Sequence, residues 1–196
     1  MKTRLLTLPG IIAIILLITT LPLRAEHYYY KQISLKEGLP SNVRCILRDE
    51  QGFIWIGTKA GLGKFDGHQL KRYKHQANDP HSLLHNLIYQ IAEDKQHNIW
   101  ILTEKGIARY QQQSNSFTFP TDEEGNYITA YSFCLVPDGI LFGGKDRIYK
   151  YSYKDSSLRL LQYFNANSFK ITALSVWDSK TLLCCSRWTG LYLVDL

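Results

Sequence analysis

Four aspartates recur at similar places along the chain, and paired carboxylates of this kind could cleave a glycosidic bond. Most glycosidases place two such groups on either side of that bond. Each aspartate here follows an apolar run and lies in or beside a turn, where its side chain can accept hydrogen bonds from the backbone of that turn. We therefore expect these residues to hold hairpins, and we expect no catalytic residue. The four are Asp49, Asp94, Asp138 and Asp178.

Two tryptophans share one recurring position, because Trp55 and Trp100 each follow one of these aspartates by six residues. An exposed indole ring could stack on a sugar, but a residue that recurs in the middle of a strand is better explained by packing between repeated units. We expect both rings to be buried. Trp188, beside Arg187 in a turn, is the better candidate for an exposed aromatic side chain.

Histidines and cysteines show no spacing typical of a metal site or of an activated nucleophile, so we expect no metal and no cofactor. Cys45 and Cys134 each precede an aspartate by four residues, which predicts the same strand position in non-adjacent units. Cys184 and Cys185 are neighbours whose side chains point to opposite faces of a strand. We expect small buried thiols rather than disulfides. The histidines of turns and connectors are His68, His75, His81, His85 and His97.

A repeat accounts for these positions, because residues 49–65 return as residues 94–110 with a constant offset of 45. A period of about 40 to 50 residues with turns between short apolar runs is typical of a β-propeller blade. One blade cannot bury its faces alone, so successive units must pack against each other. The matching pairs are Asp49 and Asp94, Trp55 and Trp100, Thr58 and Thr103, Gly61 and Gly106, and Phe65 and Tyr110.

Alternation and turn residues divide each unit into short strands, for example 43–47, 53–58, 61–65 and 69–73 in the first unit. We predict an all-β fold, a β-propeller of about four blades of four-stranded antiparallel sheets. In the third unit Leu141 replaces the tryptophan, and the last unit lacks its fourth strand. Thr58, Thr103 and Ser186 are expected to satisfy backbone groups at strand ends. The units are 36–74, 87–119, 127–163 and 171–196.

The tyrosine-rich segment 28–35 has the pattern of an outer strand that closes a propeller ring. Two arrangements follow from it. Either this strand completes the last unit in a small four-bladed ring, or the chain is an open part of a larger ring, completed by further blades or by a second copy. We favour the open arrangement, although it leaves strand edges and apolar faces uncovered.

Residues 1–25 have the pattern of a secretory signal peptide, with Lys2 and Arg4 before an apolar run and Ala25 before the cut. Retention of this segment as an anchor is the alternative. Without Lys2, Arg4 and Arg24 the formal charge falls from +6 to +3. The remaining basic residues are scattered, so we expect no nucleic-acid partner. Residues 26–196 form the predicted partial propeller, with no further membrane span.

The motifs at 38–42, 49–52, 55–58 and 61–62 resemble the two-component regulator propeller repeat, closely over 33–110 and loosely over 127–195. This resemblance implies the periplasmic sensor region of a hybrid two-component histidine kinase, in which seven-bladed propellers occur. Ligands of that family are typically oligosaccharides. No kinase segment is present in the sequence, so the resemblance implies an N-terminal sensor fragment of a phosphorelay protein that binds without catalysis.

Ligand contacts are expected in the connectors, because scaffold positions of a repeat are occupied by packing while its loops vary. The sequence leaves two alternatives to sensing: a propeller enzyme acting on polysaccharide, and a truncated or remnant propeller that contacts proteins. The candidate ligand-binding residues are Lys74, His75, Asn78, Asp79, His81, Asn86, Arg187 and Trp188.

Overall fold

The computed structural model describes residues 42–165, 169–187 and 189–195, and every regular element among them is a β-strand. The strands form four antiparallel sheets, each made from consecutive strands of the chain. The all-β architecture of successive four-stranded units that the repeat predicts is therefore confirmed. The predicted signal peptide and the predicted outer strand at 28–35 lie outside the described residues.

The first two sheets contain four strands each, in sequence order. Their registers agree with the repeat, because Trp55 lies opposite Lys64 on the next strand, as Trp100 lies opposite Arg109. The first sheet contains β1 (Val43–Arg48), β2 (Ile54–Thr58), β3 (Gly61–Phe65) and β4 (Leu70–Tyr73). The second contains β5 (Ile88–Glu93), β6 (Ile99–Thr103), β7 (Gly106–Gln111) and β8 (Ser116–Thr118).

The third sheet again has four strands, and the fourth has three among the described residues. This agrees with the incomplete last unit of the sequence. The third sheet contains β9 (Ala130–Val136), β10 (Gly139–Gly144), β11 (Arg147–Ser152) and β12 (Leu158–Tyr163). The fourth contains β13 (Ile171–Val176), β14 (Thr181–Ser186) and β15 (Gly190–Asp195).

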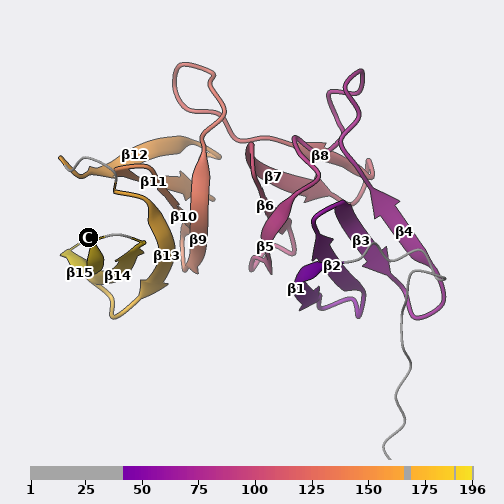
Figure 1. Ribbon diagram of the computed structural model, residues 1–196, viewed down its shortest axis with the longest axis horizontal. Helices are drawn as coiled ribbons and strands as arrows, with labels where there is room; N and C mark the ends of the chain where they lie inside the picture. The colour runs from indigo at the N-terminus through magenta and orange to yellow at the C-terminus, as the bar shows by residue number, and fades with distance from the viewer. Residues whose placement is uncertain (1–41, 166–168, 188, 196) are drawn as a thin grey trace, which may run out of the picture. The chain divides into compact units, whose positions relative to one another are not determined.

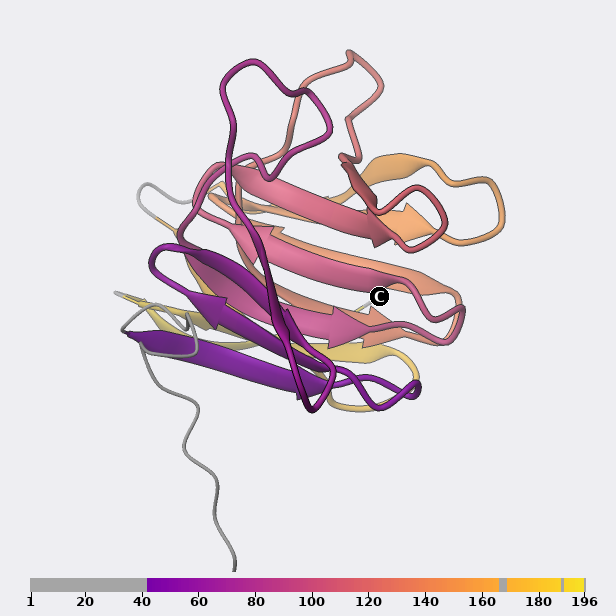
Figure 2. The same cartoon turned by 90° about the vertical axis from the view of Figure 1, so that its right-hand side faces the viewer.

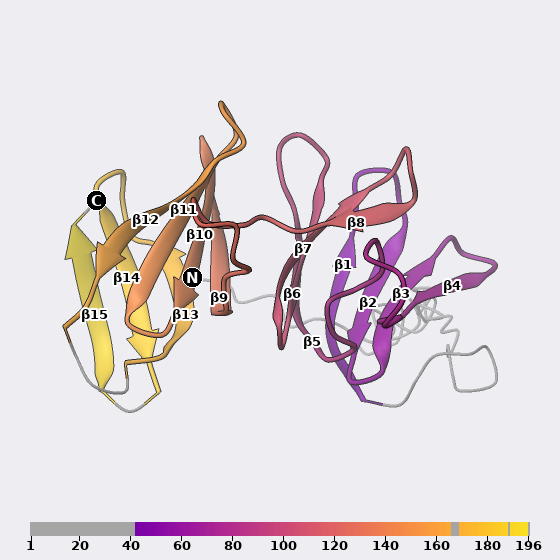
Figure 3. The ribbon, with the colours of Figure 1, turned by 90° about the horizontal axis from the view of Figure 1, so that it is seen from above.

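Successive sheets pack face to face in sequence order, and each contact between two of them is called a seam here (Figures 1 and 3). The first seam joins sheets one and two, the second joins two and three, and the third joins three and four. Each seam holds one apolar cluster. Strands β6 and β10 are buried at every residue because a sheet covers each of their faces, whereas β15 is largely exposed.

The recurring tryptophans fill the first two seams, as predicted. Trp55 is 1% exposed and Trp100 is 0% exposed. Each indole N–H donates to the recurring aspartate, from Trp55 Nε1 to Asp49 Oδ2 at 2.8 Å and from Trp100 Nε1 to Asp94 Oδ2 at 2.7 Å. The other oxygen of each carboxylate accepts backbone hydrogen bonds from the turn, so the predicted turn role of these aspartates is confirmed.

Glycine recurs at Gly61 and Gly106 for a backbone reason. Their φ angles are 126° and 148°, which side chains other than glycine rarely adopt. A Cβ at Gly61 would also stand 2.6 Å from the carbonyl oxygen of Tyr73. The turn from β2 to β3, and its copy from β6 to β7, therefore depend on these glycines.

The inner hairpin of the third sheet is shorter than its counterparts, which corrects two sequence-based expectations. Val136 pairs directly with Gly139, leaving Asp138 at the tip of the turn. Its carboxylate accepts a hydrogen bond from Lys150 Nζ at 2.7 Å instead of holding its own turn. Cys45 lies opposite Gly57 but Cys134 lies opposite Leu141, so these two cysteines do not share a strand position.

Two further expectations have mixed outcomes. All four cysteines are free thiols, and Cys184 is buried whereas the others are half-buried. Thr58 and Thr103 donate to the carbonyls of Gly61 and Gly106, each at 2.8 Å, as predicted. The hydroxyl of Ser186 is buried and finds no hydrogen-bond partner in the described part of the chain, so its expected role is wrong.

Candidate functional site

The connector between β4 and β5 carries six of the eight predicted ligand-binding residues, and Figure 2 shows it as a purple loop above the strands. Much of its polarity holds the loop itself together. Asn86 Oδ1 accepts a hydrogen bond from the His75 backbone N at 2.7 Å, and Asp79 Oδ1 accepts one from the His81 backbone N at 2.9 Å. Leu83 anchors the loop, because its side chain is fully buried in the first seam. The exposed candidate residues are Lys74, His75, Asn78 and His81.

Of the other two candidates, Arg187 does not join this group. Arg187 directly follows β14 and is exposed, so it belongs to the fourth sheet, whereas the connector joins the first and second sheets. Trp188 lies outside the described residues. Arg187 therefore lies on a different sheet from the connector, which gathers six of the candidate residues.

A polar cavity of about 410 Å³ lies between strands β3 and β4 of the first sheet and the β7–β8 hairpin of the second. The first seam thus reaches solvent through a hollow whose walls come from two sheets. Sequence reasoning missed it because its residues come from separate units. The lining residues are Phe53, Lys64, Asp66, Gln69, Leu70, Lys71, Tyr73, Tyr110 and Asn115.

The amide oxygen of Asn115 organises one wall of this cavity. It accepts hydrogen bonds from Tyr73 Oη at 2.8 Å, from Tyr110 Oη at 3.0 Å and from Lys71 Nζ at 2.9 Å. Asn115 has a φ of 50°, a conformation that asparagine tolerates better than most residues. Burial is the main cause that raises the pKa of Tyr73, and the hydrogen bond with Tyr110 raises it further. The phenol therefore stays protonated and can donate a hydrogen bond.

Lys64 lines one end of the cavity. Its ammonium group lies among three aromatic rings. Its Nζ lies 3.8 Å from the ring centre of Phe53, 5.1 Å from that of Trp55 and 5.5 Å from that of Tyr110. Cation–π attraction offsets part of the cost of moving the charge out of water. Burial lowers the pKa of Lys64, while the nearby carboxylate of Asp49 acts in the opposite direction.

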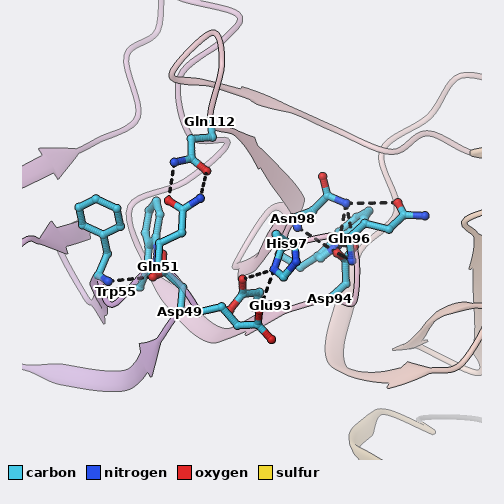
Figure 4. Close-up of polar contacts among 12 residues, drawn as sticks. Asp49, Gln51, Trp55, Glu93, Asp94, Gln96, His97, Asn98 and Gln112 are labelled. Carbon is cyan, nitrogen blue, oxygen red and sulfur yellow. Dashed lines mark hydrogen bonds and ion pairs between the residues drawn. The ribbon is translucent and has the colours of Figure 1, made fainter.

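A second polar group joins the β1–β2 hairpin of the first sheet to the β5–β6 and β7–β8 hairpins of the second (Figure 4). The amides of Gln51 and Gln112 hydrogen-bond reciprocally at 3.1 and 2.6 Å. His97 Nδ1 lies 3.1 Å from Glu93 Oε1 and 3.5 Å from Glu50 Oε2. The hydrogen bond with Glu93, and then the charge of Glu50, raise the pKa of His97. These contacts connect one loop of the first sheet to two loops of the second and fix the rim of the first seam.

Comparison with known proteins identifies the repeat. Residues 37–60 and 82–105 match the family described as two component regulator propeller. The first two units of the chain are thus similar to the two-component regulator propeller repeat. A 78-residue stretch, 38% of the chain, is 35% identical to histidine kinase P4 of Formosa agariphila and covers 6% of that protein.

Solved structures of similar fold include extracellular domains assigned to two-component systems. The propeller chain superimposes with a TM-score of 0.73 on the extracellular domain assigned to the hybrid two-component system BT3049 from B. thetaiotaomicron, at 21% identity. That match covers 85% of this chain and 25% of the other. The extracellular domain assigned to BT4673 of the same organism gives 0.69 at 20% identity, covering 88% of this chain and 23% of the other. The chain therefore spans about a quarter of the length of each.

The described residues of the propeller chain contain no group of three or more histidine, cysteine, aspartate or glutamate side chains that could hold a metal ion. No helix in the same part of the chain is long and apolar enough to cross a membrane. The groups available at the cavity are two ammonium groups, amides, phenols and the carboxylate of Asp66. Such groups can position a hydroxyl-rich ligand by hydrogen bonds beside aromatic surface.

One signal in the sequence points to this cavity. Lys64 and Arg109 are separated by the repeat offset, and both lie opposite a seam tryptophan. A basic residue that recurs beside a core position indicates a charged group held at the edge of a seam. Asn115 and Lys71 give no comparable signal, because their contact depends on how two sheets are placed in space.

Proposed function

We propose that this chain is the ligand-sensing propeller region of a two-component signalling protein, exported to the periplasm, where it binds its ligand without catalysis. The observation that carries the proposal is the match of residues 37–60 and 82–105 to the two-component regulator propeller repeat. The extracellular regions of BT3049 and BT4673, which have a similar fold, support the location.

The proposed ligand is an oligosaccharide bound in the cavity of the first seam. Lys71, Gln69 and Asn115 supply donors and acceptors for sugar hydroxyls, and Phe53 supplies aromatic surface. The connector is tied to β8, because the Phe117 backbone N donates to the carbonyl of His81 at 3.1 Å. Exposed connector residues such as Lys74 and Asn78 then reach a longer ligand.

The test is isothermal titration calorimetry of residues 26–196 against oligosaccharides first selected on a glycan array. We expect one selected oligosaccharide to bind with a single site. Lys71→Ala and Gln69→Ala should each weaken binding about tenfold, the effect of a lost hydrogen bond to a charged or polar group. Lys105→Ala removes an exposed lysine of the second sheet and should leave affinity unchanged. Absence of binding to every oligosaccharide, or equal loss in all three variants, contradicts the proposal.

A propeller enzyme acting on polysaccharide is the rival function. It needs carboxylates free to act on a substrate, and those of Asp49 and Asp94 are already engaged by a turn and an indole. A reducing-sugar assay on the oligosaccharides that bind distinguishes the two functions. We expect no release of reducing ends; a measurable turnover abolished by substituting one carboxylate would favour the enzyme.

A further inference from the structure

The first two seams hold an indole in the same way. In each, the tryptophan N–H donates to a carboxylate, at 2.8 Å for Trp55 and 2.7 Å for Trp100. In each, a tyrosine of the next sheet meets the indole edge to face with ring centres 4.9 Å apart. A basic side chain lies over the indole, with Lys64 at 5.1 Å and Arg109 at 5.9 Å. An aromatic N–H, a carboxylate and a cation thus form one repeated arrangement.

The third seam has the same positions but lacks both aromatic rings. Leu141 lies opposite Lys150, as Trp100 lies opposite Arg109, so it occupies the tryptophan position. Val194 lies opposite Leu182, as Tyr110 lies opposite Ile99, so it occupies the tyrosine position. Two large rings are replaced by two aliphatic side chains, and the seam loses the volume that the rings fill elsewhere.

A cavity of about 450 Å³ opens at this place. It lies at the hairpin ends of the third and fourth sheets and is mainly apolar. Its volume falls within the range of small-molecule sites, which is about 300 to 1,000 Å³. The lining residues are Val136, Pro137, Asp138, Leu141, Lys150, Leu161, Val176, Asp178 and Ser179.

A carboxylate and a cation remain at the rim of this cavity. Lys150 Nζ donates to Asp138 Oδ2 at 2.7 Å, and the second carboxylate there is that of Asp178. The Asp138 side chain is 69% exposed, so one of its oxygens can accept a further donor. In the other seams a carboxylate and a cation bind the N–H and the face of an indole, whereas here Lys150 and Asp138, which lies at the tip of a shorter hairpin, border an apolar space.

We propose that the third seam is a binding pocket for a planar aromatic ligand of the indole class. The ring lies between the aliphatic side chains of Leu141, Leu161 and Val176, where it replaces the missing tryptophan. The ring N–H donates to the carboxylate of Asp138, and the ammonium of Lys150 lies against the ring face. An apolar cavity lined by aliphatic side chains readily takes up an aromatic guest of matching size. This pocket is separate from the first seam, so the inference does not depend on the oligosaccharide proposal.

The experiment is calorimetric titration of the full chain with indole and with benzofuran, which has a similar shape but no N–H donor. We expect indole to bind saturably at one site and benzofuran to bind about tenfold more weakly, the cost of one hydrogen bond to a charged group. Asp138→Asn should reduce indole affinity by a similar factor and leave benzofuran affinity unchanged. Absence of saturable indole binding, or equal affinities for both compounds, overturns the proposal.

Two variants fill the pocket and one matched variant does not. Leu141→Trp restores the ring of the other seams, and Leu161→Trp adds bulk to the pocket from β12 of the same sheet. Leu160→Trp makes the same change on β12 at a neighbouring residue outside the pocket lining. We expect both filling variants to lose indole binding and Leu160→Trp to retain it, with folding checked by circular dichroism. If Leu141→Trp does not fold, Leu161→Trp decides, and indole binding by a folded filling variant overturns the proposal.

Discussion

The carboxylates of Asp49 and Asp94 each serve two neighbours at once. One oxygen accepts backbone hydrogen bonds from the turn, and the other accepts the N–H of a buried indole. A buried N–H without an acceptor is costly, so the aspartate fixes both the turn and the tryptophan. This pairing explains why the two residue types recur together at a constant spacing.

The first prediction concerns this hydrogen bond. Asp94→Ala should lower the free energy of unfolding by about 1 to 3 kcal/mol, because it leaves the buried Trp100 N–H unpaired. Asp138→Ala is the matched control, since its carboxylate is exposed and bonds only a surface lysine. We expect that control to change stability by less than about 0.5 kcal/mol. Urea unfolding followed by tryptophan fluorescence measures both, and equal losses would contradict this account.

His97 makes the contact between the first two sheets dependent on pH. Its pKa is raised by Glu93 and by Glu50, so folding favours the protonated imidazole. The resulting stabilisation is fully present below the unfolded pKa of about 6.5 and is lost as the pH rises through the higher folded pKa. The contact between the first two sheets should therefore be less stable at alkaline pH than at acidic pH.

The second prediction follows from that sign. His97→Asn, which tolerates the local φ of 62°, should be less stable than the unmodified chain at about pH 6. At alkaline pH the difference should shrink, because the imidazole loses its proton as the pH rises through the folded pKa. His81→Asn, an exposed histidine of the connector, serves as the control. Thermal melts across this range measure the effect, and a difference that grows with pH would refute the charge argument.

Residue-level errors of the sequence analysis have a common cause. Asp138 and Cys134 were aligned with the other units by counting from the aspartate, but the third hairpin is shorter and shifts the register. Ser186 precedes a turn longer than that after Thr103, since it pairs with Gly190. Counting residues from the recurring aspartate predicts equivalent positions where the turns have the same length. It fails wherever a turn changes length.

At the level of strands, each seam balances a small residue against a large one. Gly57 faces Ile88 in the first seam, because a Cβ there would lie 2.7 Å from Ile88 Cγ2. Gly143 faces Ile171 in the third seam, where the same distance is 2.5 Å. In the second seam the sizes are exchanged, with Leu102 and Ala130 in one cluster. The volume of each pair is conserved while the sheet that supplies the large residue changes.

The third prediction tests this exchange. Gly143→Ala should destabilise the fold by about 1 to 3 kcal/mol, because the added methyl group overpacks the third seam. Ile171→Ala alone should also destabilise it, by about 2 to 5 kcal/mol, through the cavity it leaves. The double variant should lose less than the sum of the two changes. Urea denaturation of all four proteins completes the cycle, and strictly additive effects would show that these positions do not pack together.

The strands were predictable and the cavities were not. Period-two alternation and turn residues located every strand of the first sheet to within one residue at each end, as the bounds of β1 and β4 show. The cavity at Lys71 and Asn115 joins residues of two sheets, and its existence depends on the placement of those sheets. Periodicity in one strand contains no information on that placement.

At the scale of the whole described propeller region, apolar side chains remain exposed on the first strand and the last. On β1, Ile46 is 71% exposed and Val43 is 47% exposed. On β15, Leu193 is 64% exposed and Leu191 is 61% exposed. The corresponding strands of the middle sheets are covered by a neighbouring sheet, as the clusters of the three seams show. Exposed apolar surface of this kind favours association.

The last prediction is that residues 26–196 self-associate through these two strands. Ile46→Lys and Leu193→Lys should each weaken association about tenfold, because a lysine charge is costly to cover with another sheet. Leu160→Lys makes a matched change at a side chain 54% exposed on β12, in a sheet that already has neighbours on both sides, and should leave association unchanged. Sedimentation velocity over a range of concentrations measures the effect. A chain that stays monomeric throughout, or lysine variants that associate as the unmodified chain does, would show that these faces do not attract one another.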